Sequence, residues 1–183
     1  MNSMMNKEQL RNAGFVFSED GKTLKECRNK MIESAEIPEG VTSIGDWAFM
    51  DCNILFSIKL PDSLTSIGEG AFFFCESLRE IIIPDSVVLI GARAFSICLR
   101  LKKVILPRGL ISIAEECFAA CSDLENITIP QGVTTIEDEA FRECLNLKRI
   151  ILPDSIIHIG TDSFDDCPCL PHLPLMAKQN QRG

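Results

Sequence analysis

The segment LREIIIPDSVVLIGARAFSIC, residues 78–98, decides the fold because its pattern recurs every 23 residues along the chain. Aligning the chain with itself at that spacing places phenylalanine on phenylalanine and, three residues later, cysteine on cysteine. The phenylalanine column is Phe49, Phe72, Phe95, Phe118, Phe141 and Phe164. The cysteine column is Cys52, Cys75, Cys98, Cys121, Cys144 and Cys167. Six units without an insertion therefore run from Ile37 to Pro174, and they predict a repeat solenoid.

The first part of each unit has the alternation of a short strand. In LREIIIP, the side chains of Leu78, Ile81 and Ile83 fall on one face, and Pro84 then stops the strand. A single unit cannot bury enough apolar surface to fold alone, so its neighbours must supply the missing contacts. We expect each strand to pair in parallel with its neighbour, about 4.8 Å away, so that like side chains form ladders.

The second part of each unit predicts an extended segment followed by a turn. An acid stands where the turn begins, at Asp46, Glu69, Glu115 and Asp138, and free N–H groups at the start of a helix favour a carboxylate. We therefore expect an α/β repeat solenoid. It would be a right-handed leucine-rich-repeat coil with one short parallel strand per unit on the concave face and a short helical turn on the convex side.

The unit LxxIxIPxSVxxIGxxAFxxC resembles the BspA-like leucine-rich repeat family. The resemblance covers about three quarters of the chain and implies a solenoid that binds other proteins, often at the bacterial cell surface or after secretion. It supplies no catalytic residues. Glycine or serine replaces the asparagine ladder of the commoner leucine-rich pattern, which favours this branch. The positions are Gly40, Ser63, Ser86, Gly109, Gly132 and Ser155.

The composition of the chain excludes some classes of function. The 183 residues carry a formal net charge of -8, which argues against nucleic acid because phosphate binding needs a dense positive surface. No run of 18 apolar residues predicts a membrane span, and MNSMMNKEQLRNAGF lacks the pattern of a secretory signal. As it stands the sequence predicts a cytoplasmic protein, whereas the family resemblance points to the cell surface or to secretion.

The nine cysteines predict packing, not chemistry. Six form the buried column, and Cys117 replaces an alanine of another column, whereas Cys27 and Cys169 lie outside the columns. The two histidines, His158 and His172, stand alone, so no zinc site is expected. The sequence also has no nucleophile elbow, phosphate loop or metalloprotease motif. We expect no cofactor, no metal and no enzymatic activity.

A partner-binding surface is expected on the outward positions of the strands. An apolar stripe roughly 15 Å long follows from the strand spacing, and basic side chains flank it. The stripe consists of Ile82, Ile105, Thr128 and Ile151, and its flanks contain Arg79, Lys102, Lys103, Lys148 and Arg149. Such a surface suits an acidic or extended peptide of a protein partner. The alternative is that isoleucine simply favours strands and stacks on itself.

A second apolar patch is expected on the back of the first three units. It contains Trp47, Met50, Phe73, Phe74, Ile97 and Leu99. The repeat does not require Phe73 and Phe74, so another surface must cover them. Either the N-terminal segment does so, or a second chain or a partner. In the latter case the protein is a structural unit that self-associates through this patch, with its strand face idle.

The two ends are expected to differ. Residues 1–36 form a cap, with a short helix in NKEQLRNAGF and a hairpin around Asp20-Gly21. The six repeats occupy residues 37–174, and residues 175–183 are a polar tail. Pro168, Pro171 and Pro174 remove the donors that another strand would use. This weak closure leaves room for a weak homo-oligomer.

Overall fold

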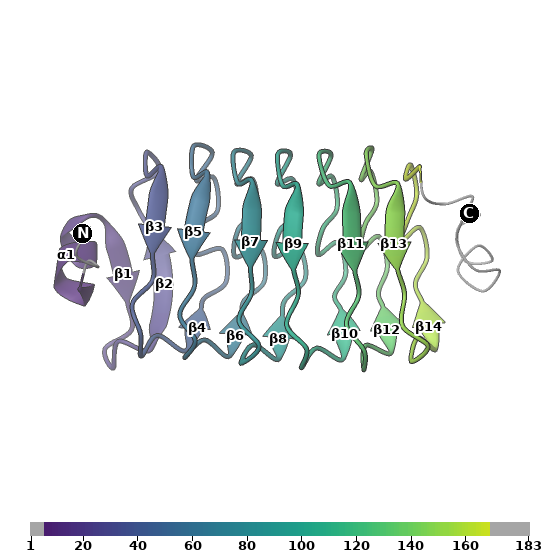
Figure 1. Cartoon of the computed structure of the whole chain (residues 1–183). Helices are drawn as coiled ribbons and strands as arrows, with labels where there is room; N and C mark the ends of the chain where they lie inside the picture. The colour runs from purple at the N-terminus through teal and green to yellow at the C-terminus, as the bar shows by residue number, and fades with distance from the viewer. Residues whose placement is uncertain (1–5, 169–183) are drawn as a thin grey trace.

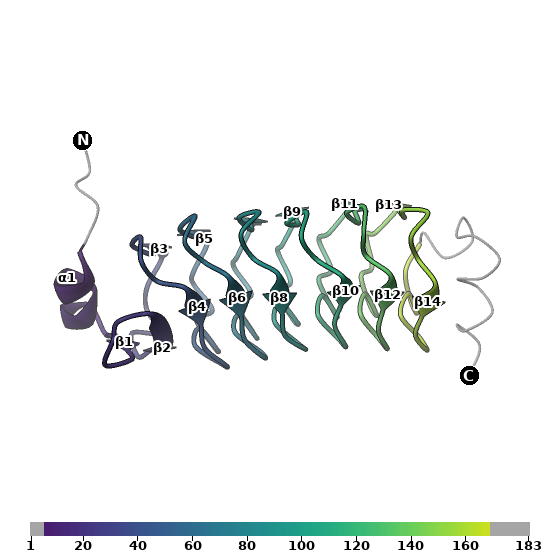
Figure 2. The same cartoon turned by 90° about the horizontal axis from the view of Figure 1, so that it is seen from below.

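The structure, a computed structural model, describes residues 6–168, and these form one solenoid with two rows of short strands (Figures 1 and 2). The first row contains β3 (Ser34–Glu36), β5 (Ser57–Lys59), β7 (Glu80–Ile82), β9 (Lys103–Ile105), β11 (Asn126–Thr128) and β13 (Arg149–Ile151). The second row contains β4 (Ser43–Ile44), β6 (Ser66–Ile67), β8 (Leu89–Ile90), β10 (Ser112–Ile113), β12 (Thr135–Ile136) and β14 (His158–Ile159). The expectation of one strand per unit is therefore wrong, because the extended segment after the proline also pairs with its neighbours.

Paired strands follow the repeat register. Within the six repeats, parallel partners stand 23 residues apart, so Ile81 lies opposite Val104 and Ile44 opposite Ile67. This register places like side chains on like along the stack. Leu78, Ile81 and Ile83 are all buried, as the alternation in the sequence predicts.

The phenylalanine column forms a stack of rings through the centre of the solenoid. All six rings are fully buried, and neighbouring rings are nearly parallel, with centroids between 5.0 Å (Phe49 to Phe72) and 5.5 Å (Phe118 to Phe141) apart. Phe15 closes the N-terminal end of the stack edge-on, 6.0 Å from Phe49. Offset stacking of this kind adds to the free energy gained from removing the rings from water.

The cysteine column is buried as predicted, and its thiols also make hydrogen bonds. The Sγ atom of Cys75 donates to the carbonyl oxygen of Phe49 in the preceding coil at 3.2 Å, and later cysteines repeat this contact. Cysteine therefore fills a slot for a small side chain and supplies a weak donor there. Cys27 is buried beside this column too, and its thiol is in hydrogen-bond contact with the thiol of Cys52. That contact lowers the pKa of Cys27 and raises the pKa of Cys52.

We expect stability to fall at alkaline pH because of the buried thiols. Burial raises the pKa of Cys75 to about 12 and also raises those of Cys98, Cys117 and Cys121. In the unfolded chain such thiols titrate near about 8.5. Stability is therefore complete below that pH, and above it each thiol removes about 1.4 kcal/mol per pH unit until its folded pKa is reached. Urea unfolding at several pH values from 8 to 10 measures the slope, which for these four thiols together is about four times the slope of one.

The matched variant for this prediction is Cys98→Ala. Alanine keeps a small apolar side chain in the slot but has no thiol to titrate. The variant should lose stability less steeply with rising pH than the unmodified protein, by about 1.4 kcal/mol per pH unit. Equal slopes in the two proteins would show that the buried thiols do not cause the alkaline loss.

The short helical turn expected on the convex side is not confirmed; this segment consists of turns. In residues 47–52, alternate N–H groups donate to the carbonyl three residues earlier, and those between them donate to the next coil. The N–H of Phe49, for example, donates to the carbonyl oxygen of Ala71 at 2.7 Å. Two residues per unit adopt left-handed backbone angles, as at Trp47 (φ 57°) and Asp51 (φ 60°), and the N–H groups of both donate to the next coil. A helix could not bond to its neighbour in this way, because its N–H groups are used internally.

The N-terminal segment contains the helix and hairpin that the sequence indicates. The helix α1 (Lys7–Asn12) begins with a capping box formed by Asn6 and Gln9, and Gly14 follows it with a positive φ of 99°. Strands β1 (Phe15–Phe17) and β2 (Thr23–Cys27) form an antiparallel hairpin, and β2 then pairs in parallel with β4. The hairpin thus covers the first edge of the second row (Figure 2).

Neither row is one continuous sheet, contrary to the expected ladder. The first row consists of three bonded pairs, β3–β5, β7–β9 and β11–β13. The second row is divided into a sheet that ends at β8 and another that begins at β10. Both rows are therefore interrupted at the same place along the stack, between β8–β9 and β10–β11.

The pairwise bonding in the first row follows an alternation in the sequence. The residue after each strand is isoleucine in the first member of a bonded pair and leucine in the second. In chain order these residues are Ile37, Leu60, Ile83, Leu106, Ile129 and Leu152. The N–H of Ile83 donates to the carbonyl oxygen of Ile105 at 3.0 Å, and Ile37 and Ile129 make the equivalent bond. A β-branched residue favours extended backbone, which prolongs the strand and its pairing by one residue.

Candidate functional site

The apolar stripe predicted on the strands is exposed. Ile82, Ile105 and Ile151 keep 54%, 44% and 45% of their surface accessible, and Thr128 between them is exposed as well. The inward neighbours of these residues on the same strands are buried or half-buried, so the strand alternation is what turns the stripe outward. We call this surface, formed by β5, β7, β9, β11 and β13, the strand face.

The stripe is divided by a groove that sequence reasoning missed. Ile82 lies opposite Ile105, and Thr128 lies opposite Ile151, but β9 and β11 belong to separate sheets. A surface groove of about 390 Å³ follows the gap between these two strands. Its walls and floor contain Lys103, Val104, Ile105, Leu106, Arg108, Asn126, Ile127, Thr128 and Pro130. The groove therefore has an apolar floor, one exposed isoleucine on its wall and two basic side chains beside it.

A second cleft, of about 420 Å³, lies beside the groove and is lined by charged residues. It contains Arg79, Arg100 and Lys102 with one carboxylate, that of Asp123. Lys102 and Arg79 stand side by side on adjacent coils, since the backbone N–H of Lys102 donates to the carbonyl oxygen of Arg79 at 2.8 Å. The ammonium group of Lys102 lies 3.9 Å from the Asp123 carboxylate. Three cations thus face one anion in a protein that is acidic as a whole.

The structure brings together some of the predicted basic residues and not others. Arg79 and Lys102 meet in the cleft, and Lys103 borders the groove. Lys148 and Arg149 are exposed two units further along, and neither lines the groove or the cleft. The binding roles of all these residues remain predictions.

Three charged residues of the two hollows were not predicted as site residues: Arg100, Arg108 and Asp123. They stand outside the strands, at positions where the repeat does not restrict the residue type. One sequence feature could have indicated the groove. Leu106 follows β9 and is one of the leucines in the isoleucine–leucine alternation after the strands.

The second predicted patch, on the turn side, is an aromatic cluster that largely covers itself. Trp47 packs edge-on against Phe73 with centroids 5.5 Å apart, and Phe73 packs against Phe74 at 4.7 Å. Met50, Ile97 and Leu99 are half-buried beside the turns. Gly70 makes the cluster possible, because a Cβ atom there would lie 2.1 Å from the Trp47 ring. Trp47 itself remains 37% exposed.

Two searches of residues 6–168 bear on other kinds of site. In that part of the chain, no three histidine, cysteine or acidic side chains lie close enough together to hold a metal ion. Within the same residues, no helix has the length and apolar character needed to cross a membrane. Cys169, His172 and the closing prolines 171 and 174 lie outside the described residues, as does the tail at 175–183.

The sequence of this chain matches the family model of the BspA type leucine rich repeat region. The match contains six copies and extends over residues 23–110 and 54–171. The chain belongs to this family. The BspA-type leucine-rich repeat is a solenoid often used for protein–protein interaction, and the family is generally non-catalytic.

Solved bacterial proteins share the BspA-type fold. A leucine-rich repeat protein from Bacteroides ovatus is 27% identical, with a TM-score of 0.66 over 84% of this chain and 48% of its own. The T. pallidum leucine-rich repeat protein is 23% identical, with a TM-score of 0.72 over 97% of this chain and 94% of its own. A leucine-rich repeat protein from Eubacterium ventriosum is 21% identical, with a TM-score of 0.74 over 86% of this chain and 50% of its own. This chain thus spans about half of the first and third. No curated protein matches it.

Proposed function

We propose that this BspA-type chain is a non-catalytic protein-interaction module that binds an extended polypeptide segment on its strand face. The observation that carries the proposal is the exposure of Ile82, Ile105 and Ile151 on this face, together with the groove beside Ile105 where β9 and β11 do not pair. An exposed apolar stripe on a soluble protein marks a surface that gains free energy when another chain covers it. The family's frequent use in protein–protein interaction supports the same conclusion.

The groove provides an anchor for such a segment. Val104, Leu106 and Ile127 form a floor already shielded from water, so an apolar side chain entering there would complete a small core. The backbone polar groups along the open edges of β9 and β11 can also bond to a ligand backbone. The bordering Lys103 and Arg108 favour a ligand with acidic residues near its apolar one.

We propose that the natural setting of this interaction is the bacterial cell surface or the secreted fraction, in the manner of an adhesin. The family resemblance supports this setting. Fractionation of cells that produce the full gene product tests it, and recovery of the protein from the cytoplasm alone would contradict it.

A selection experiment tests the strand face. Peptides of 16 residues selected from a random display library on the unmodified protein should lose at least about tenfold in affinity when Ile82, Ile105 and Ile151 are all changed to aspartate, because apolar contact area is lost. Fluorescence anisotropy with labelled peptides measures the affinity. Thr65→Asp on the second row is a matched control that adds a carboxylate elsewhere. Selected peptides that bind the triple variant unchanged would exclude this face.

The alternative is a structural unit that self-associates through the aromatic cluster. The remaining exposure of Trp47 favours it, whereas the edge-on packing of Phe73 on both neighbouring rings already covers part of the cluster. Light scattering of the unmodified protein beside the Phe73→Ser, Phe74→Ser double variant separates the two functions. A monomer in both samples would remove the assembly function.

A further inference from the structure

The arginines of residues 6–168 fall into two groups, those with a partner and those without. Four of them pair with carboxylates: Arg28, Arg93, Arg108 and Arg142. Arg11 instead lies over the ring of Phe17, 5.6 Å from its centroid. The remaining three within this part of the chain, Arg79, Arg100 and Arg149, have no carboxylate within ion-pair distance.

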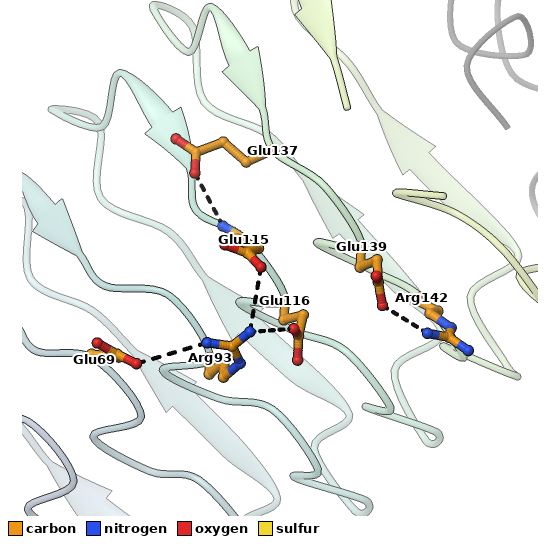
Figure 3. A network of polar contacts seen from close by, with 7 residues as sticks. All are labelled: Glu69, Arg93, Glu115, Glu116, Glu137, Glu139 and Arg142. Carbon is orange, nitrogen blue, oxygen red and sulfur yellow. Dashed lines mark hydrogen bonds and ion pairs between the residues drawn. The ribbon is translucent and has the colours of Figure 1, made fainter. Parts of the chain in front are cut away.

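The turn side shows how the fold neutralises arginine where it has only a structural role. Figure 3 shows Arg93 between three carboxylates from the two neighbouring turns, Glu69 on one side and Glu115 with Glu116 on the other. Its guanidinium lies 3.8 Å from Glu69, 3.3 Å from Glu115 and 2.6 Å from Glu116. Arg142 pairs with Glu139 at 2.7 Å in the same way. With acidic residues in excess along the whole chain, an unpaired arginine is therefore a departure from the local pattern.

Two of the three unpaired arginines line one cleft. Arg79 and Arg100 share it with Lys102, and Asp123 is the single carboxylate there. Asp123 lies within ion-pair distance of Lys102 alone, so both guanidinium groups keep their donors available. Guanidinium groups present several N–H donors in a plane, which matches the paired oxygens of carboxylates and phosphates. The cleft therefore has an excess of positive charge and the geometry for an oxyanion.

We propose that Arg79, Arg100 and Lys102 form an anion subsite that binds two adjacent carboxylates of an acidic stretch in the polypeptide partner. That the ligand is a polypeptide follows from the proposed function, and the inference rests on it in this respect. Two carboxylates balance the charge that three cations and Asp123 leave uncompensated. A phosphorylated side chain has the same dianionic chemistry, and the experiment distinguishes it from the acidic pair.

The subsite adjoins the groove, which sets the arrangement of the ligand. Lys102 lines the cleft and Lys103, the next residue, lines the groove. One extended segment can therefore place an apolar side chain between β9 and β11 while its acidic pair, a few residues away, lies against the arginines. Both hollows belong to the same interrupted part of the stack.

Peptide titration tests the subsite. The probes are three soluble ten-residue peptides that differ only at their centre, which is Asp-Asp, Asn-Asn or phosphoserine-Ser. Binding is followed by NMR from the arginine Nε–H resonances. We expect saturable binding of the Asp-Asp peptide, at least about tenfold tighter than that of Asn-Asn, because charge-assisted hydrogen bonds are lost with the amides. Binding of the Asp-Asp peptide should weaken with added salt. Tighter binding of phosphoserine than of Asp-Asp would overturn the choice of ligand.

Three variants assign the effect to named residues. Arg79→Gln with Arg100→Gln should remove the preference for Asp-Asp over Asn-Asn, and Arg11→Gln, at an arginine of the N-terminal cap that pairs with no carboxylate, should leave it intact. Asp123→Asn removes the competing carboxylate and should tighten Asp-Asp binding severalfold. Equal effects of the Arg79/Arg100 and Arg11 changes, or no preference in the unmodified protein, would overturn the subsite. A weaker affinity of the display-selected peptides for the triple isoleucine variant would still support the strand face in that case. The two proposals can therefore fail independently.

Discussion

Replacing Phe95 by alanine is expected to lower the free energy of unfolding by about 3–5 kcal/mol, the range for removing a buried aromatic ring. Phe95 is fully buried in the middle of the stack, with Phe72 5.2 Å away on one side and Phe118 5.4 Å away on the other. Its removal leaves a cavity that two rings line, and neighbouring coils held by backbone hydrogen bonds cannot collapse to fill it. Urea unfolding followed by circular dichroism measures the change.

The matched control is Phe73→Ala. This ring is half-buried in the aromatic cluster on the turn side and has no place in the repeat column. We expect a loss of about 1 kcal/mol, since a partly exposed ring gives up less contact on truncation. If the two substitutions cost the same, the ring stack would not be the main source of stability in this solenoid.

The sequence predicted the features that every unit shares. The phenylalanine, cysteine and leucine columns recur at one spacing, so their burial follows from stacking units in register, and the structure buries each column wherever it is described. The exposure of Ile82, Ile105 and Ile151 follows from strand alternation in the same way. The BspA-type family was recognisable for the same reason, because six copies of one pattern carry it.

The features that sequence reasoning missed are those in which one unit differs from the next. The left-handed backbone at Ile97 (φ 61°) could not be foreseen, because a β-branched residue is unfavourable there and only bonds to the next coil compensate for it. The groove lies beside Leu106, which stands where the first strand of each bonded pair is followed by isoleucine, and the repeat pattern accepts either residue. Arg100 and Asp123 become neighbours of Arg79 and Lys102 only once the coils are stacked.

Replacing Gly91 by alanine is expected to cost about 1–3 kcal/mol, the range for adding a methyl group to a packed interior. Gly91 follows β8, and its N–H donates to the carbonyl oxygen of Ile67 in the preceding coil at 2.9 Å. A Cβ atom at this position would lie 2.6 Å from the backbone N of Glu69 and 2.7 Å from the carbonyl carbon of Gly68. These are backbone atoms, so the two coils must separate and the pairing of β6 with β8 must weaken.

Gly109→Ala is the control that adds the same methyl group in the same part of the solenoid. Its closest contact would be the Cγ1 atom of Val88 at 3.3 Å, a side-chain atom that can move, and the carbonyl oxygens of Asp85 and Val87 would lie at an ordinary 3.8 Å. We therefore expect a change within about 0.5 kcal/mol. Glu137, at the position equivalent to Gly91 two units later, keeps its N–H bond to Ile113 at 2.9 Å, so a side chain as such does not prevent pairing. The expected loss therefore comes from the close approach at Gly91 itself. Amide hydrogen exchange should speed up at Gly91 and along β8 in the alanine variant, whereas unchanged exchange there would contradict the steric argument.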